Sequence, residues 1–238
     1  MIPRILRDFL PRFWLVAAAG FAFYLFEPAF HRHGPVDPGA LAELGPAGLS
    51  ATLANLAGLS MVILLAGFVS RDRRRGYYRM LLAHPVNPLA LYGLRWLVAL
   101  LLALAAAGLF LVVGQLAAWG EWRGGAEGLW LALLSALVYG GLMAFLSTAL
   151  PRGDAWVAVG LFLLTFFWLQ ALGIGAEPFS APLRRLLTFV LPPQTALQDV
   201  YNALLGRGLA PGASAYAAGY GVFWLGAAAT LLRVREWP

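Results

Sequence analysis

The sequence predicts an all-α integral membrane protein, and three observations lead to this class. First, 61% of the 238 residues are hydrophobic, which is more apolar surface than a water-soluble domain of this length needs to bury. Second, these residues fall into long runs separated by segments that contain proline, glycine and arginine. Third, arginines gather beside the ends of the runs, as they do in cytoplasmic loops. We therefore expect a single transmembrane domain that covers residues 1–238.

The residue types that the chain lacks exclude several kinds of chemistry. All 17 basic residues are arginine, and a chain without lysine cannot form the Walker A loop that binds nucleotide phosphates. The chain has no cysteine, which excludes disulfides, thiolate nucleophiles and cysteine-based metal sites. Cytoplasmic loops that meet anionic headgroups explain the net charge of +6. We therefore expect no cofactor in this chain and no nucleic-acid partner.

The N-terminal segment, residues 2–14, is expected to form an amphipathic helix that lies in the inner leaflet. The run that follows lacks a convincing cleavage site for a secretory signal, so the segment is expected to be retained. Its hydrophobic and charged residues fall on opposite faces of the helix, the first set being Ile2, Ile5, Leu6, Phe9, Leu10 and Phe13 and the second Arg4, Arg7, Asp8 and Arg12.

Six hydrophobic runs are candidates to cross the bilayer. Between the fifth and the sixth, residues 173–214 are too polar and too rich in proline to cross. We place this segment on the outer face, as a re-entrant or amphipathic segment with short helices at 183–190 and 195–205. Arg95, near the start of the third run, is expected to extend to the cytoplasmic headgroups. The six runs cover residues 14–30, 47–69, 88–119, 128–150, 155–172 and 215–232.

The arginines set the orientation of the chain. Translocating several guanidinium groups through hydrocarbon is unfavourable, so an arginine cluster beside a span stays in the cytoplasm. With this rule both termini are cytoplasmic, and eleven arginines lie inside against five outside. We expect a multi-pass protein of the inner cell membrane. The cluster that decides this follows the second span and contains one acid, Asp72, among Arg71, Arg73, Arg74, Arg75 and Arg79.

A short helix is expected in this cytoplasmic loop, at residues 76–85. Pro85 marks its end, because proline does not continue a helix. An ordinary loop held at the lipid surface by arginines is the alternative, but such a loop does not need a group of apolar side chains. We interpret the helix as a contact for a cytoplasmic partner, with the candidate residues Gly76, Tyr77, Tyr78, Arg79, Met80, Leu81, Leu82, His84 and Pro85.

This layout resembles the permease subunits of type-2 ABC exporters. The most telling local match is Gly76, Leu81, Leu82, Pro85, Val86 and Asn87, which stand like the glycine, paired leucines and Pro-Val-Ser of that family. A second match is residues 183–208, similar to the family's proline-containing segment before the last span. The chain departs from the family in carrying arginines where members commonly have acidic residues, at Arg73, Arg74, Arg75 and Arg79.

The resemblance implies a transmembrane subunit that works as a homodimer or a related heterodimer. Two copies of a separate ABC ATPase subunit would bind ATP and magnesium, and residues 76–85 would be a coupling helix in a groove of each. The implied cargo is amphipathic, lipid-like or drug-like. No metal site is expected, since His31 and His33 lack a third ligand nearby. No enzyme activity is expected in this chain either, since the spans lack a dense set of carboxylates or histidines and no Ser/His/Asp grouping converges.

Polar residues within the spans are candidates to line a conduit. Side-chain amides and hydroxyls in hydrocarbon also form hydrogen bonds between helices, and that explanation serves at least as well. Glu27 lies beside Pro28 near the end of the first span and is expected to be solvated. The conduit candidates are Asn55, Ser60, Gln115, Thr165 and Gln170.

Two other functions stay open. The protein could be a non-transporting membrane scaffold or assembly factor whose arginine-rich loop binds a cytoplasmic partner. It could also be an ion-coupled secondary transporter, although such proteins have internal repeats and intramembrane charges that this sequence does not display.

Overall fold

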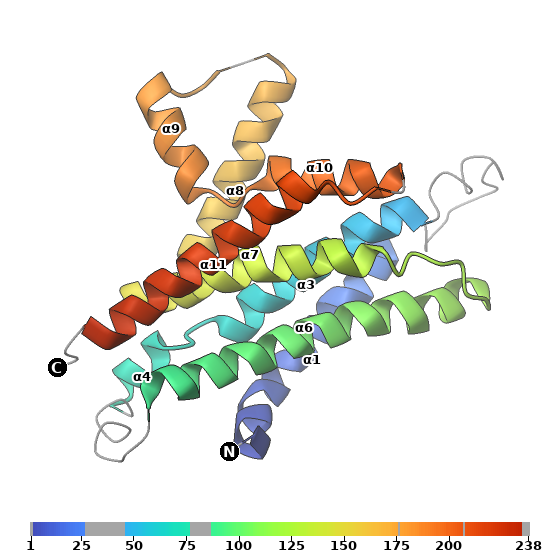
Figure 1. The fold of residues 1–238 in the computed structure, drawn as a ribbon. Coiled ribbons are helices and arrows are strands. Elements are labelled where there is room, and N and C mark those ends of the chain that lie inside the picture. The colour runs from blue at the N-terminus through green and yellow to red at the C-terminus, as the bar shows by residue number, and fades with distance from the viewer. Residues whose placement is uncertain (1, 27–45, 77–86, 176, 207, 235–238) are drawn as a thin grey trace.

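The computed structural model describes residues 2–26, 46–76, 87–175, 177–206 and 208–234. Every regular element in these ranges is a helix, which confirms the predicted all-α class (Figure 1). The helices are α1 (Ile2–Phe26), α3 (Pro46–Leu65), α4 (Ser70–Arg74), α6 (Pro88–Trp119), α7 (Gly128–Ala149), α8 (Asp154–Gly173), α9 (Ala181–Val190), α10 (Gln194–Leu205) and α11 (Pro211–Val234).

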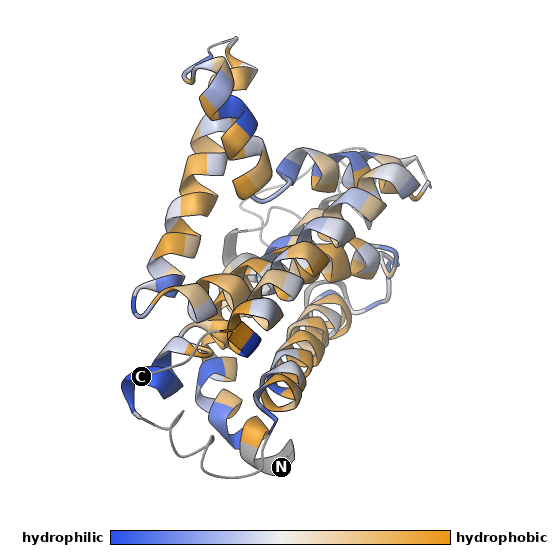
Figure 2. Cartoon of the chain, turned by 60° about the vertical axis from the view of Figure 1, so that its left-hand side comes forward, coloured by the Kyte–Doolittle hydropathy of each residue, from blue (hydrophilic) through white to orange (hydrophobic). Residues whose placement is uncertain are grey.

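Within the described ranges, five helical segments are long and apolar enough to cross a membrane. Figure 2 shows hydrophobic residues along the middles of the long helices and hydrophilic residues at their ends, as a bilayer requires. The fold is therefore compatible with a multi-pass membrane protein. The five segments are Leu49–Arg74, Pro88–Ala117, Gly128–Ala149, Asp154–Gly173 and Pro211–Val234.

The N-terminal region differs from the expectation of two elements that meet near Trp14. α1 is one uninterrupted helix over Ile2–Phe26, and Pro11 lies inside it. Proline removes one backbone hydrogen bond but need not end a helix that neighbouring helices hold. Ile5, Phe9 and Val16 of α1 are buried. The helix therefore packs against the bundle both before and after the boundary expected near Trp14.

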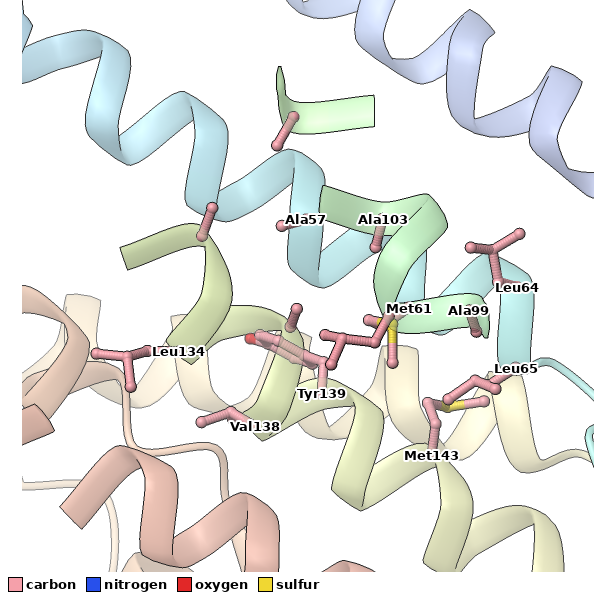
Figure 3. Packing of buried hydrophobic residues seen from close by; sticks show 14 of the residues in the cluster. Ala57, Met61, Leu64, Leu65, Ala99, Ala103, Leu134, Val138, Tyr139 and Met143 are labelled. Atoms are coloured by element: carbon pink, nitrogen blue, oxygen red, sulfur yellow. The ribbon is translucent and has the colours of Figure 1, made fainter. Parts of the chain in front are cut away.

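The core lies where α3 meets α7, with α1 and α6 on one side and α11 on the other. Met61 of α3, Ala99 of α6 and Met143 of α7 are fully buried there (Figure 3). Two glycines let α7 and α11 approach closely, because a Cβ atom on Gly141 would lie 2.2 Å from the carbonyl oxygen of Gly221. Small residues commonly permit such contacts between membrane helices.

α8 and α9 stand away from the rest of the bundle (Figure 1). Most of the side chains on α8 are exposed, and α9 has no buried residue. Large apolar residues such as Trp156, Phe166 and Phe167 are exposed along α8. This surface needs lipid or protein to cover it.

Candidate functional site

The candidate site is the attachment of the arginine-rich segment to the bundle. α3 ends at Leu65, and residues 66–69, here called the α3–α4 turn, lead into α4. Gly67 in this turn has φ +71°, a left-handed conformation that glycine adopts without steric cost. The turn points its backbone N–H groups at side chains of α7 and α8.

Asp154, the first residue of α8, receives two hydrogen bonds from this region. Its Oδ2 atom accepts from the amide nitrogen of Gly67 at 2.8 Å and from the Oγ of Ser70 at 3.1 Å. The residue is only 5% exposed. A carboxylate in the first turn of a helix is also favoured by the helix dipole. Asp154 therefore connects the start of α8 to the turn before α4.

The C-terminal end of α7 provides a second attachment. The Oγ of Ser147 accepts hydrogen bonds from the backbone N–H of Val69, at 2.9 Å, and of Ser70, at 3.3 Å. Arg73 donates through Nη1 to the carbonyl oxygen of Thr148 at 3.1 Å. Ser147 is fully buried, so the two hydrogen bonds that it accepts are shielded from water and their loss leaves polar groups unsatisfied.

A third attachment joins α1, α4 and α6 through charge. Arg95 of α6 pairs with Asp72 of α4 at 2.6 Å and with Asp8 of α1 at 3.1 Å. The hydroxyl of Tyr92 donates to the same Asp72 carboxylate at 3.2 Å, and the Tyr92 ring packs edge-on against Phe68. Arg95, expected to extend to headgroups, instead has 20% side-chain exposure and connects three helices.

Arg12 completes the contacts between α1 and this region. Its Nη1 donates to the carbonyl oxygen of Leu64 in the last turn of α3. Such carbonyls have no partner within their own helix, and a cation near them is favoured by the dipole. Burial, and then the positive charge of nearby Arg71, lower the pKa of the Arg12 guanidinium below its ordinary value.

Of the predicted coupling residues, only Gly76 lies in the described part of the chain. It follows α4, is exposed and has φ +71°. On the other side of the loop, Asn87 caps α6 by accepting a hydrogen bond from the N–H of Leu89 at 2.9 Å, and Pro88 begins the helix. The remaining candidates lie outside the described residues, namely Tyr77, Tyr78, Arg79, Met80, Leu81, Leu82, His84 and Pro85.

Three of the five conduit candidates form hydrogen bonds with nearby parts of the chain, so a role in contacting cargo is not needed to explain their polar side chains. Ser60 donates to the carbonyl oxygen of Leu56 at 2.6 Å, and Thr165 donates to that of Leu161 at 2.8 Å, each within its own helix. Gln115 holds the loop after α6, since it donates to the carbonyl oxygen of Gly124 and accepts from the N–H of Arg123, both at 2.7 Å.

The other two candidates, Asn55 and Gln170, are exposed and lie on different helices. Asn55 lines a cavity of about 310 Å³ between α3, α7 and α8, here called the Asn55 cavity. Most of its walls are apolar, and Gln170 is not part of it. The five candidates thus do not form one site. The walls of this cavity are Asn55, Gly58, Leu59, Val62, Tyr139, Ala158, Val159 and Phe162.

Sequence reasoning missed Asp154 and Ser147, the two residues that hydrogen-bond to the α3–α4 turn and to α4. A signal existed for Asp154, because it is the only acid between Glu127 and Glu177 and it begins an apolar run. Ser147 carried no such signal, because a serine within a hydrophobic helix commonly bonds to its own backbone.

Comparison with protein-family models, with curated proteins and with solved structures yields no match. The class that the fold defines is a helical protein, with five segments in its described residues that are long and apolar enough to span a membrane. In the residues that the structure describes, no group of three or more histidine, aspartate or glutamate side chains is placed to hold a metal ion.

Proposed function

We propose that this chain is the transmembrane permease subunit of an ATP-driven exporter, paired with a second permease copy and with two separate ABC ATPase subunits. The observation that carries the proposal is the attachment of α4 to the bundle. Asp154, Ser147 and Arg95 bind the two sides of this segment, immediately before the loop in which the coupling helix is expected.

The attachment gives a physical route for coupling. A partner that closes on ATP would displace residues 77–86, whose preceding segment hydrogen-bonds to α7 and α8 and whose following residue caps α6. Packed helices move as rigid bodies between discrete arrangements. A displacement of the loop would therefore shift α6, α7 and α8 relative to one another, which biases the permease between inward-open and outward-open states.

The Asn55 cavity supports an amphipathic or lipid-like cargo. It combines apolar walls with the amide of Asn55 and the ring of Tyr139, whose centroid lies 6.5 Å from that of Phe162. Small-molecule sites are commonly apolar cavities with a few polar groups that set orientation. One wall belongs to α8, a helix with few contacts to the bundle, so movement of α8 would change the width of the cavity.

Affinity purification of the full chain from the membrane of its own cell tests the proposal. We expect a polypeptide with Walker A and Walker B motifs to be recovered in equal amounts. Replacement of Leu81 and Leu82 with aspartate should abolish this recovery, because charges on the predicted contact face cannot enter an apolar groove. The matched control is Leu209→Asp, at an exposed position in the loop before α11. Equal recovery with the Leu81 and Leu82 variants would contradict the proposal.

A scaffold function is the second candidate, and the exposure of α4 favours it. Arg71, Arg74 and Arg75 are exposed around this short helix, which suits an acidic cytoplasmic partner. The effect of ATP on the partner distinguishes the exporter function from the scaffold function. An exporter subunit stimulates or is driven by ATP hydrolysis in its partner, whereas a scaffold retains its partner without any ATP-dependent change.

A further inference from the structure

A second cavity, of about 320 Å³, lies where α1, the α3–α4 turn and the start of α6 meet. We call it the arginine cavity, because its walls include the five arginines Arg7, Arg12, Arg71, Arg75 and Arg95. Two carboxylates, Asp8 and Asp72, also face it. The cavity is therefore built from several helices and carries more positive than negative charge.

The two carboxylates are already engaged. Both pair with Arg95, at 3.1 Å for Asp8 and 2.6 Å for Asp72. In the part of the chain that the structure describes, no ion pair involves Arg7, Arg71 or Arg75. These three guanidinium groups leave the cavity with uncompensated positive charge.

Arg12 adds to this excess from a half-buried position. Burial and the positive charge of Arg71 disfavour the charged form of Arg12, and the carboxylates of Asp154 and Asp8 offset only part of this effect. Its recorded partner in the described residues is a neutral carbonyl oxygen, that of Leu64. An anion in the cavity would offset both the lost hydration of Arg12 and the repulsion from Arg71.

The chemistry of the walls selects the anion. Guanidinium groups donate several hydrogen bonds in a fixed planar arrangement that matches the oxygens of a phosphate group. Convergence of arginines from separate elements is typical of phosphate recognition. The cavity also has room for part of the group to which the phosphate is attached.

The surface next to the cavity indicates where that phosphate comes from. Leu10 and Trp14 follow Arg7 by three and seven residues on α1, and this spacing places both beside Arg7 on the helix. The expected division of residues 2–14 into two opposite faces therefore does not hold at Arg7. The exposed fractions of Leu10 and Trp14 are 59% and 71%. An acyl chain could lie along this apolar strip while its phosphate contacts Arg7. A free phosphate ion has no acyl chain, so it would make no favourable contact with this apolar strip.

We propose that the arginine cavity is a binding site for the phosphate group of an anionic phospholipid. The site holds the lipid between α1 and the α3–α4 turn, beside the pair formed by Arg95 and Asp72. This inference stands on the cavity itself and does not depend on the proposed exporter function.

Native mass spectrometry of the purified full chain in detergent tests the proposal, with phosphatidylglycerol and phosphatidylcholine as probes. We expect phosphatidylglycerol to bind more tightly. Arg71→Gln and Arg7→Gln should each weaken its binding by about threefold to tenfold, the range for net loss of one hydrogen bond at a site exposed to solvent. The matched control is Arg152→Gln, which removes one exposed positive charge from the turn before α8, outside the cavity.

Asp8→Asn tests the same site in the opposite direction. It removes a negative charge from the wall while Asp72 still pairs with Arg95, so phosphatidylglycerol should bind about twofold to threefold more tightly. Inorganic phosphate serves as the competing probe. Displacement of the lipid only at a large excess of phosphate supports a lipid site. Binding of inorganic phosphate without any binding of phosphatidylglycerol overturns it, as does an equal effect of Arg152→Gln and the two cavity variants.

Discussion

The Oδ2 atom of Asp154 lies 2.8 Å from the backbone nitrogen of Gly67, a residue 87 positions earlier in the chain. This hydrogen bond joins the first turn of α8 to the turn that carries the chain from α3 into the arginine-rich segment. It is the clearest sign that the arginine-rich segment is part of the bundle rather than a loop beside it. The first prediction tests that bond.

Asp154→Ala should destabilise the protein by about 1–3 kcal/mol, because it removes the acceptor of the Gly67 N–H and of the Ser70 hydroxyl. Amide hydrogen exchange should accelerate in residues 67–75 more than elsewhere. Thermal unfolding in detergent and exchange measured by mass spectrometry check both effects. Asp199→Ala, on the exposed side of α10, is the control. Unchanged exchange in residues 67–75 would show that the bond does not hold the turn.

Arg95→Gln should destabilise the protein because it leaves the partly buried Asp72 carboxylate without its cation. We expect a loss of about 2–4 kcal/mol, near the range for breaking a shielded ion pair. Adding Asp72→Asn to Arg95→Gln should recover part of the loss, since the double variant leaves only the exposed Asp8 carboxylate without its Arg95 partner. The measurement is a double-mutant cycle of unfolding free energies. Additive effects of the two substitutions would mean that the pair contributes no coupling.

Gly141→Ala should destabilise the contact between α7 and α11. The added Cβ would lie 2.2 Å from the carbonyl oxygen of Gly221, and backbone atoms there cannot move without separating the helices. We expect a cost of about 1–3 kcal/mol in thermal unfolding. Gly160→Ala is the matched control, because a Cβ on Gly160 meets no atom within 4 Å and alanine is the better helix former. A gain in stability from Gly141→Ala would contradict the close helix contact.

Val159→Trp should reduce cargo transport by filling the Asn55 cavity. Val159 lines this cavity and is 40% exposed, so the larger ring can enter without disrupting the core. We expect ATP-dependent efflux of an amphipathic dye from cells to fall several-fold while recovery of the ATPase subunit stays unchanged. Val222→Trp, at an exposed position on α11 outside the cavity, should leave efflux as it was. Normal efflux with Val159→Trp would show that cargo does not pass through the Asn55 cavity.

Hydrophobic runs predicted the long helices closely, as the expected span at 88–119 and the observed α6, Pro88–Trp119, illustrate. Such runs extend over many residues and are bounded by caps such as Asn87, so local sequence is enough. At the expected boundary near Trp14 the structure has one continuous helix, because tertiary packing of α1 decides whether the helix continues past Pro11.

The attachments around α4 were beyond sequence reasoning. Arg95 and Asp72 are 23 residues apart, and Ser147 and Val69 are 78 apart, so only the packed fold brings them together. The polar residues of the spans carried the same ambiguity, because an amide such as Gln115 can hold a loop as readily as it can contact cargo. The six-span layout and the coupling helix stay predictions.

Cross-linking from residue 82 tests the central claim most directly. The chain has no cysteine, so Leu82→Cys introduces a single thiol to which a photoreactive group can be attached in isolated membranes. We predict that illumination joins this position to an ABC ATPase subunit, and that the yield differs between ATP and ADP. The account is contradicted if the thiol reacts with an impermeant reagent added outside intact cells, or if no ATPase is found among the cross-linked products.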